Sequence, residues 1–193
     1  MAFASDSRSI SIALVVVATT SVMVWFGTGL FPMWPLLWFA PLPVLLFAGR
    51  SSLWAAALAS ALSWVLGSLN MWHYFSAALH MPPPVRVVIL VVPALVFMLA
   101  VLFYRALLRR GAWWSALLGF PAAWVSFEYV FNLISPHGSA ASLSYSQLNC
   151  LSVLQLAAIT GPWGISFLLL PFPPRLPLEF ICAKLSQSKR CAS

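Results

Sequence analysis

Glu128 is the residue whose type and setting most suggest chemistry. It is the only charged residue between Arg110 and Arg175, and apolar segments flank it on both sides. An ionisable side chain in such a segment is costly to bury, so by default it is a candidate for function. The alternative is a structural carboxyl group that accepts hydrogen bonds near the end of the segment. The residues alone leave these two interpretations open.

Cysteine and histidine are the other residue types that could act as nucleophile, base or metal ligand. The chain has three of each, namely Cys150, Cys182, Cys191, His73, His80 and His137. No two cysteines have the C-x-x-C spacing of zinc or redox sites, and the histidine spacing gives no sign of ligands that converge on a metal. Cys150 would need a partner base to act as a nucleophile, and none is recognisable beside it. We therefore predict no catalytic residue, no metal site and no cofactor.

The composition places these residues in a membrane. Charged residues make up 7% and hydrophobic residues 62% of the 193-residue chain, whereas a soluble surface needs about a quarter of its residues charged. The long uncharged runs are continuously apolar, which indicates spanning helices rather than the alternating strands of a barrel. The net charge of +7 comes from scattered basic residues at the ends of these runs. Such residues set topology and contact anionic headgroups, so no nucleic-acid partner is predicted.

The apolar runs predict an all-α membrane protein, a polytopic bundle of about six transmembrane helices. The predicted spans cover about residues 10–26, 34–47, 53–72, 85–104, 113–134 and 153–170. Residues 1–170 would form the transmembrane domain, and 171–193 a basic, disordered cytoplasmic tail. If both termini are cytoplasmic, nine of the ten basic residues lie inside and only Arg86 lies outside. The positive-inside rule therefore predicts N-in and C-in.

This topology places Glu128 near the outer membrane interface. It lies 18 residues beyond Arg110, or about 27 Å along a helix, and the hydrocarbon core is about 30 Å thick. The residues around it are aromatic, as in an interfacial belt, and include Trp124, Phe127, Tyr129 and Phe131. We expect the carboxyl group near the lipid headgroups rather than at the bilayer midplane.

Small residues recur at every fourth position of the third predicted span, at Ala55, Ala59, Ser63 and Gly67. Residues four apart lie along one helix face, and small side chains on one face let two membrane helices approach closely. We therefore predict that this face packs against a neighbouring helix.

Five short segments are distinctive in their residues and their order. They are Gly-Ser-Leu-Asn-Met-Trp at 67–72, Pro-Ala-Ala-Trp-Val-Ser-Phe-Glu at 121–128, Leu-Ser-Tyr-Ser-Gln at 143–147, Leu-Gln-Leu-Ala at 154–157 and Gly-Pro-Trp-Gly-Ile-Ser-Phe at 161–167. Together they resemble the membrane part of the apolipoprotein N-acyltransferase family. The resemblance covers roughly residues 10–170 and is most specific from Glu128 to Phe167.

The resemblance implies an activity and a place. Family members transfer an acyl chain from a phospholipid to the N-terminal cysteine of lipoproteins, at the outer face of the bacterial inner membrane. A multi-pass inner-membrane protein with phospholipid and lipoprotein substrates as partners is therefore expected. By resemblance, the residues that face these substrates are Trp72, Trp124, Glu128, Tyr145, Ser146 and Gln147.

The resemblance does not extend to the family's catalytic residues. That chemistry uses a Glu-Lys-Cys triad in a nitrilase-like domain that follows the spans, and none of the three cysteines here matches the nucleophile. The 23 residues after Leu170 are too few for a domain with its own core. We therefore expect a truncated, frameshifted or split gene product that is inactive alone. A split gene would supply a separately encoded nitrilase-like domain as a partner, and whether the chain is itself an enzyme stays open.

A small polytopic transporter or membrane scaffold without catalysis is the alternative function. A transporter would need a midplane site of broken helices with ionisable residues, and no charge here falls clearly at the midplane. An intramembrane hydrolase would need a nucleophile and a base that converge, and the sequence shows no such pair. The acyltransferase-like membrane domain is the favoured prediction.

Overall fold

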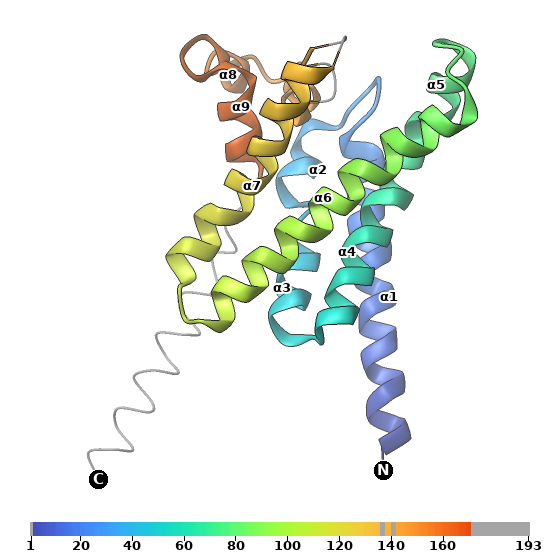
Figure 1. The fold of residues 1–193 in the computed structure, drawn as a ribbon, viewed down its shortest axis with the longest axis vertical. Helices are drawn as coiled ribbons and strands as arrows, with labels where there is room; N and C mark the ends of the chain where they lie inside the picture. Colours follow the sequence, from blue (N-terminus) through green and yellow to red (C-terminus); the bar gives the residue numbers. More distant parts are fainter. Residues whose placement is uncertain (1, 136–137, 140–141, 171–193) are drawn as a thin grey trace.

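The computed structural model describes residues 2–135, 138–139 and 142–170, and the regular structure within these ranges is entirely helical (Figure 1). The long helices are α1 (Ala2–Gly27), α4 (Leu53–Ser68), α6 (Pro83–Arg109) and α7 (Trp113–Ile134). The shorter elements are α2 (Trp34–Phe39), α3 (Leu42–Arg50), η1 (Leu69–Met71), α5 (Trp72–Ala77), η2 (Leu143–Gln147), α8 (Leu151–Leu154) and α9 (Ala157–Leu169). The predicted tail, 171–193, lies outside the described residues.

The described helices confirm the predicted all-α architecture and its membrane character. Four stretches are long and apolar enough to cross a membrane, namely Ser9–Gly27, Leu53–Ala77, Pro83–Arg109 and Trp113–Ile134. The predicted span 113–134 has the bounds of α7. Helix α6 extends beyond the predicted span 85–104 at both ends. The count of six spans and the N-in, C-in orientation stay predictions.

The other two predicted spans, 34–47 and 153–170, are each divided in the structure. The sequence predicted one kinked helix over 34–47, but α2 ends before Pro41 and α3 begins after it. Proline lacks the backbone N–H that a helix interior needs, yet it suits the first turn of a new helix. In α9, Gly161 has a φ of 67° and interrupts the helix just before Pro162. The apolar helices of these regions are shorter than the four candidate spans.

The small residues of α4 lie against α1. Ala59, Ser63 and Gly67 are buried, and Ala55 is half-buried. The Ser21 hydroxyl donates to the backbone carbonyl of Ser63 at 3.1 Å, so the two backbones pass close together. This is the contact that small side chains permit between membrane helices.

An aromatic cluster fills the space between α4, α6 and α7. The ring of Trp64 lies 4.5 Å from that of Trp124 and 4.7 Å from that of Phe97, centroid to centroid. Phe97 meets the edge of Phe120 at 5.9 Å. These rings are buried, and rings at such separations attract each other beyond the area they bury. The cluster fixes α7, and therefore Glu128, relative to α4 and α6.

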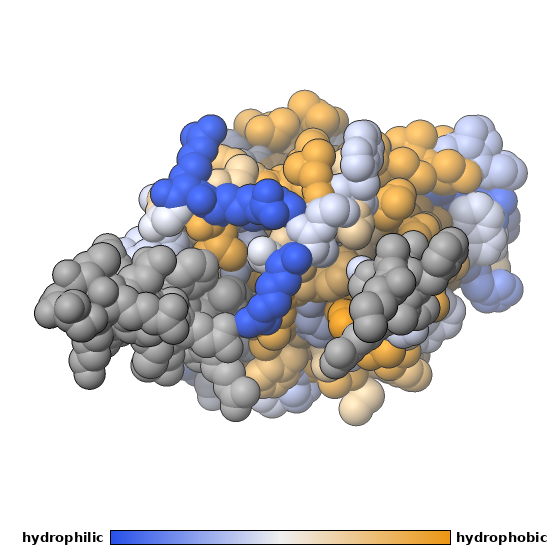
Figure 2. All heavy atoms as spheres, turned by 90° about the horizontal axis from the view of Figure 1, so that it is seen from below, coloured by the Kyte–Doolittle hydropathy of each residue, from blue (hydrophilic) through white to orange (hydrophobic). Residues whose placement is uncertain are grey.

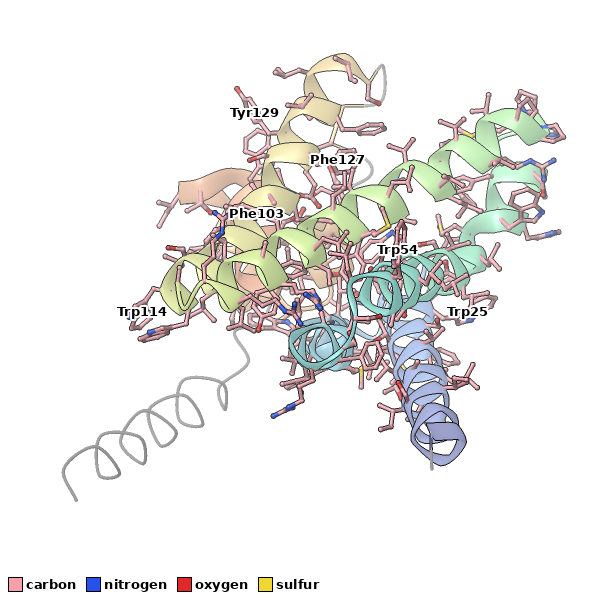
Figure 3. The ribbon with its side chains drawn as sticks, turned by 60° about the horizontal axis from the view of Figure 1, so that its bottom comes forward. Trp25, Trp54, Phe103, Trp114, Phe127 and Tyr129 are labelled. Atoms are coloured by element: carbon pink, nitrogen blue, oxygen red, sulfur yellow. The ribbon has the colours of Figure 1, made fainter. Side chains whose placement is uncertain are left out.

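The outer surface of the bundle is apolar. Seen from below, mostly hydrophobic side chains surround a few hydrophilic ones (Figure 2). Large aromatic side chains are exposed on several helices (Figure 3), among them Trp25, Trp54, Phe103, Trp114 and Tyr129. A soluble monomer rarely exposes so much contiguous apolar surface, so this surface suits contact with lipid chains.

Candidate functional site

Glu128 lies in the last two turns of α7, where α9 packs beside the helix and Leu143 of η2 bonds to the carboxyl group. The helix ends at Ile134, and Ser142 is the N-cap residue of η2. The Ser142 side chain accepts a hydrogen bond from the backbone N–H of Ser144, as an N-cap serine does. Leu143, the first residue of η2, lies beside the Glu128 side chain.

The Glu128 carboxyl group holds residues 142–147, the η2 loop, against α7. It is 5% exposed. Its Oε1 accepts from Trp124 Nε1 at 2.9 Å and from the backbone N–H of Leu143 at 2.8 Å. Its Oε2 accepts from the Ser142 hydroxyl at 3.0 Å. A buried carboxyl group needs such partners because an unsatisfied one would cost free energy, and here two of the three come from the loop.

A small cluster of serines extends the network to α9. The Ser142 hydroxyl lies 2.9 Å from the Ser144 hydroxyl and 3.1 Å from the Ser166 hydroxyl. All three residues are buried. Because a hydroxyl can both donate and accept, Ser142 joins α7, η2 and α9 at one point.

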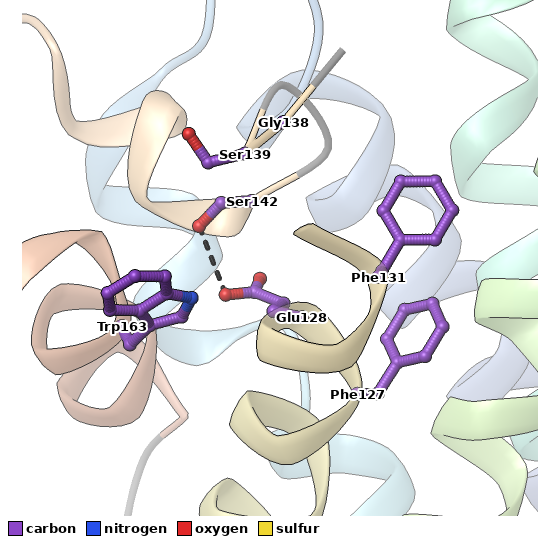
Figure 4. A pocket seen from close by; sticks show the side chains of 7 residues that line it. All are labelled: Phe127, Glu128, Phe131, Gly138, Ser139, Ser142 and Trp163. Carbon is purple, nitrogen blue, oxygen red and sulfur yellow. Dashed lines mark hydrogen bonds between the residues drawn. The ribbon is translucent and has the colours of Figure 1, made fainter. Parts of the chain in front are cut away.

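A shallow pocket opens beside Glu128 (Figure 4). Its lining residues are Phe127, Glu128, Phe131, Gly138, Ser139, Ser142 and Trp163, and the volume that water can occupy in it is about 10 Å³, room for about one molecule. Trp163 lies on one side of Glu128, and Phe127 and Phe131 on the other. The indole N–H of Trp163 is buried and has no partner among the described residues. An unpaired donor and a carboxyl group in one pocket can hold a water molecule or a polar atom of a ligand.

Gln147 fastens the other end of η2 to α2. It is fully buried. Its Oε1 accepts from Trp38 Nε1 at 3.0 Å, and its Nε2 donates to the Trp34 carbonyl at 3.1 Å and to the Ser146 hydroxyl at 2.9 Å. Both functional ends of the amide are therefore satisfied within the protein. The loop is held between α2 and α7.

Comparison with known proteins decides the family. The family model of the apolipoprotein N-acyltransferase N-terminal domain matches residues 10–172. The chain belongs to the apolipoprotein N-acyltransferase family. The apolipoprotein N-acyltransferase of Geobacter metallireducens is 33% identical over 147 residues, which are 70% of this chain and 27% of that protein. That of Chlorobaculum tepidum is 34% identical over 73 residues, 38% of this chain and 14% of that protein.

The chain thus spans about a quarter of the length of the Geobacter metallireducens relative. No solved structure gives a significant match. The predicted resemblance to the membrane part of this family is confirmed, since the matched residues are those of the family's N-terminal domain.

The structure brings together most of the residues that the family resemblance predicted to face substrate. Glu128, Trp124, Ser146 and Gln147 are buried, and they bond to protein groups around η2. Tyr145 is exposed. The four buried side chains are held inside the protein and do not form an open surface. Contact of any of the predicted residues with a substrate stays a prediction.

Trp72 is the predicted residue that lies apart from this group. It begins α5, which stands on the opposite side of the bundle from α7 and η2 (Figure 1). Its ring is half-buried, and the guanidinium of Arg86 lies 4.5 Å from its centroid. This is a cation–π contact between α5 and the first turn of α6. Trp72 therefore cannot share the Glu128 pocket in this structure.

The described histidines and the described cysteine do not share one site. His73 and His80 are exposed, and His137, Cys182 and Cys191 lie outside the described residues. Cys150 is a free, half-buried thiol. Within the part of the chain that the structure describes, no three histidine, cysteine or acidic side chains gather as a metal site would require.

Sequence reasoning did not name Ser142, Ser166, Trp38 or Trp163 as site residues, although Trp163 and Ser166 lie in the family segment at 161–167. One signal was available for Ser142, because a serine directly before a short helical segment is a common N-cap. Trp38 could not be found in this way, since it lies 109 residues from its partner Gln147. A contact at that separation depends on how α2 packs.

Replacing Gln147 by leucine tests how η2 is held. In Gln147→Leu the indole N–H of Trp38 loses its acceptor, and an unsatisfied buried donor costs about 1–3 kcal/mol. We expect the free energy of unfolding in mixed micelles to fall by about 2 kcal/mol and the fluorescence of the tryptophans to change. Leu148→Ala is the matched control, because Leu148 is exposed on the same segment. An unfolding free energy that falls equally in both variants would contradict this role.

Proposed function

We propose that this chain acts as the membrane domain of an apolipoprotein N-acyltransferase and holds phospholipid and lipoprotein substrates near the outer leaflet. The observation that carries the proposal is the match to the N-terminal domain of this family over residues 10–172. The pocket beside Glu128, with the unpaired Trp163 N–H, supports it as a place for a polar group of a substrate. The site residues of the proposal are Glu128, Tyr145 and the rest of η2, with Trp124 as support.

We further propose that residues 1–193 do not transfer acyl chains unaided. Acyl transfer through a cysteine needs a thiolate, a base and a stabiliser of the oxyanion. Cys150 is the one cysteine within the described residues, and no acid or lysine is bonded to it in the hydrogen bonds of this part of the chain. A nitrilase-like domain, encoded with the chain or separately, would supply the chemistry.

The proposed setting is the bacterial inner membrane, with both termini cytoplasmic and six crossings. In this proposal, α2 with α3 and α8 with α9 serve as the two short crossings. The distribution of basic residues supports the orientation. A transporter is less well supported, because Glu128, the one acid within a predicted span, lies near one end of α7 rather than at its centre.

The purified chain in nanodiscs tests the proposal. With a fluorescent phospholipid and a diacylated lipopeptide, we expect lipopeptide binding without acyl transfer. Glu128→Ala should weaken that binding about tenfold, because the η2 loop loses two of its bonds to α7. Trp114→Ala, an exposed residue at the start of α7, is the control and should bind normally. Triacylated lipopeptide, or an acylated Cys150 seen by mass spectrometry, would overturn the second proposal. Failure to bind lipopeptide would overturn the first.

A further inference from the structure

The end of the bundle opposite Glu128 carries a group of basic side chains. Arg50 ends α3, Arg105 and Arg109 lie in the last turns of α6, and Arg110 follows them. Hydrophilic side chains stand out on this face among apolar ones (Figure 2). Glu128 lies near the far end of α7, away from this group. The Glu128 carboxylate therefore does not balance the charge of Arg105, Arg109 and Arg110.

Arg105 differs from the other three because it is buried. It is 4% exposed, whereas Arg50, Arg109 and Arg110 are exposed. Its Nη2 donates to the backbone carbonyl of Ser51, in the turn between α3 and α4. Its Nε is buried and has no partner among the described residues. A buried charge is stable only when it is paired and its hydrogen bonds are made.

A second unpaired polar group lies at the same place. The hydroxyl of Ser51 is buried without a partner among the described residues, and Ser51 is the residue whose carbonyl receives the Arg105 bond. The two residues that the Arg105 bond joins at the α3–α4 turn thus each carry an unpaired donor, one of them charged. Guanidinium and hydroxyl groups together are suited to an oxyanion with several acceptor oxygens, and a phosphate has the matching geometry.

We propose that Arg105 and Ser51 bind a phosphate group, that of an anionic phospholipid headgroup, at the cytoplasmic end of the bundle. The apolar helix surfaces beside the site would contact the acyl chains. The bound lipid would brace the end of α6 against the α3–α4 turn. The site is independent of acyl transfer, since it lies at the other end of the bundle from Glu128.

Native mass spectrometry of the full chain from nanodiscs tests the site. In discs of phosphatidylcholine with phosphatidylglycerol, we expect the wild type to retain phosphatidylglycerol preferentially. Ser51→Ala keeps the carbonyl that holds Arg105, so it should leave the melting temperature in pure phosphatidylcholine unchanged. It should lower the apparent affinity for phosphatidylglycerol about three- to tenfold. Arg105→Gln should abolish the preference. Arg109→Gln is the matched control and should change it less than about twofold, as exposed charges do.

Two arms identify the source of the phosphate. Phosphatidylglycerol is added in one, and inorganic phosphate is titrated into pure phosphatidylcholine discs in the other, with the melting temperature as readout. A rise in the first arm supports a lipid headgroup, and a rise in the second supports the same site filled by free phosphate. No rise in either arm overturns the site. Equal loss in Arg109→Gln and Arg105→Gln, or an unchanged preference in both Ser51→Ala and Arg105→Gln, also overturns it.

Discussion

Glu128→Ala is expected to release the loop from 142 to 147 and to lower the free energy of unfolding by about 3 kcal/mol, because it removes three hydrogen bonds at once. The Trp124 indole and the Leu143 backbone N–H lose their acceptor at a buried position, and each unsatisfied donor costs about 1–3 kcal/mol. Ser142 keeps its serine neighbours. Unfolding in mixed micelles measures the loss of stability.

Maleimide labelling of Cys150 reports on the loop itself. Cys150 is half-buried just after η2, and its labelling rate in a background without Cys182 and Cys191 should rise about tenfold in Glu128→Ala, as local opening becomes easier. Glu128→Gln is the matched control. Its amide oxygen can still accept from Trp124 and Leu143, and the Ser142 hydroxyl can turn to accept, so the loop should stay protected. An alanine variant with wild-type labelling and stability would show that the network does not hold the loop.

Gly67→Ala is expected to separate α1 from α4. A Cβ at this position would lie 2.5 Å from the Cβ of Val24 and 3.0 Å from the Ser21 carbonyl oxygen, and neither atom is the flexible end of a side chain. The helices must therefore move apart, which also lengthens the Ser21–Ser63 bond. Overpacking of this kind costs about 1–3 kcal/mol, and the better helix propensity of alanine offsets about 1 kcal/mol in part. We expect a net loss of about 1–2 kcal/mol in unfolding experiments.

Gly119→Ala is the matched control for this change. Its Cβ would meet the ring of Phe103 at 2.9 Å and a methyl group of Leu107 at 3.1 Å. These are side-chain ends, and Phe103 is exposed, so they can turn away at little cost. Alanine's better helix propensity favours this variant by up to about 1 kcal/mol, so the stability of Gly119→Ala should equal or exceed that of the wild type. Equal stability of the two variants would mean that the close approach at Gly67 is not needed.

The helices were predictable because the signals that form them are local. Apolar runs gave the position of every long helix, and the bounds predicted for 113–134 are those of α7. The prediction was weaker where prolines occur, since Pro41 could mean a kink or a break. In the structure α3 begins after it. The spacing of Ala59, Ser63 and Gly67 indicated a packing face, but not that α1 would be the helix to fill it.

The candidate site was predictable only in part. Sequence reasoning singled out Glu128 for its lone charge and Gln147 for its place in a family segment. It could not pair Gln147 with Trp38, 109 residues away, or foresee that Trp163 would leave an unpaired N–H beside the carboxyl group. Such contacts depend on the angle and depth at which helices pack, which residue spacing along one helix does not contain.

The sequence by itself determined the membrane environment of this protein, the positions of its long helices and its family, because hydrophobic runs, scarce charge and short motifs are properties of contiguous residues. Tertiary structure decided what each polar side chain does. It buried Glu128 under its own loop and buried Arg105 against the Ser51 turn. Whether a polar group faces lipid, water or protein is set by packing between elements distant in sequence, and its free energy depends on that surrounding.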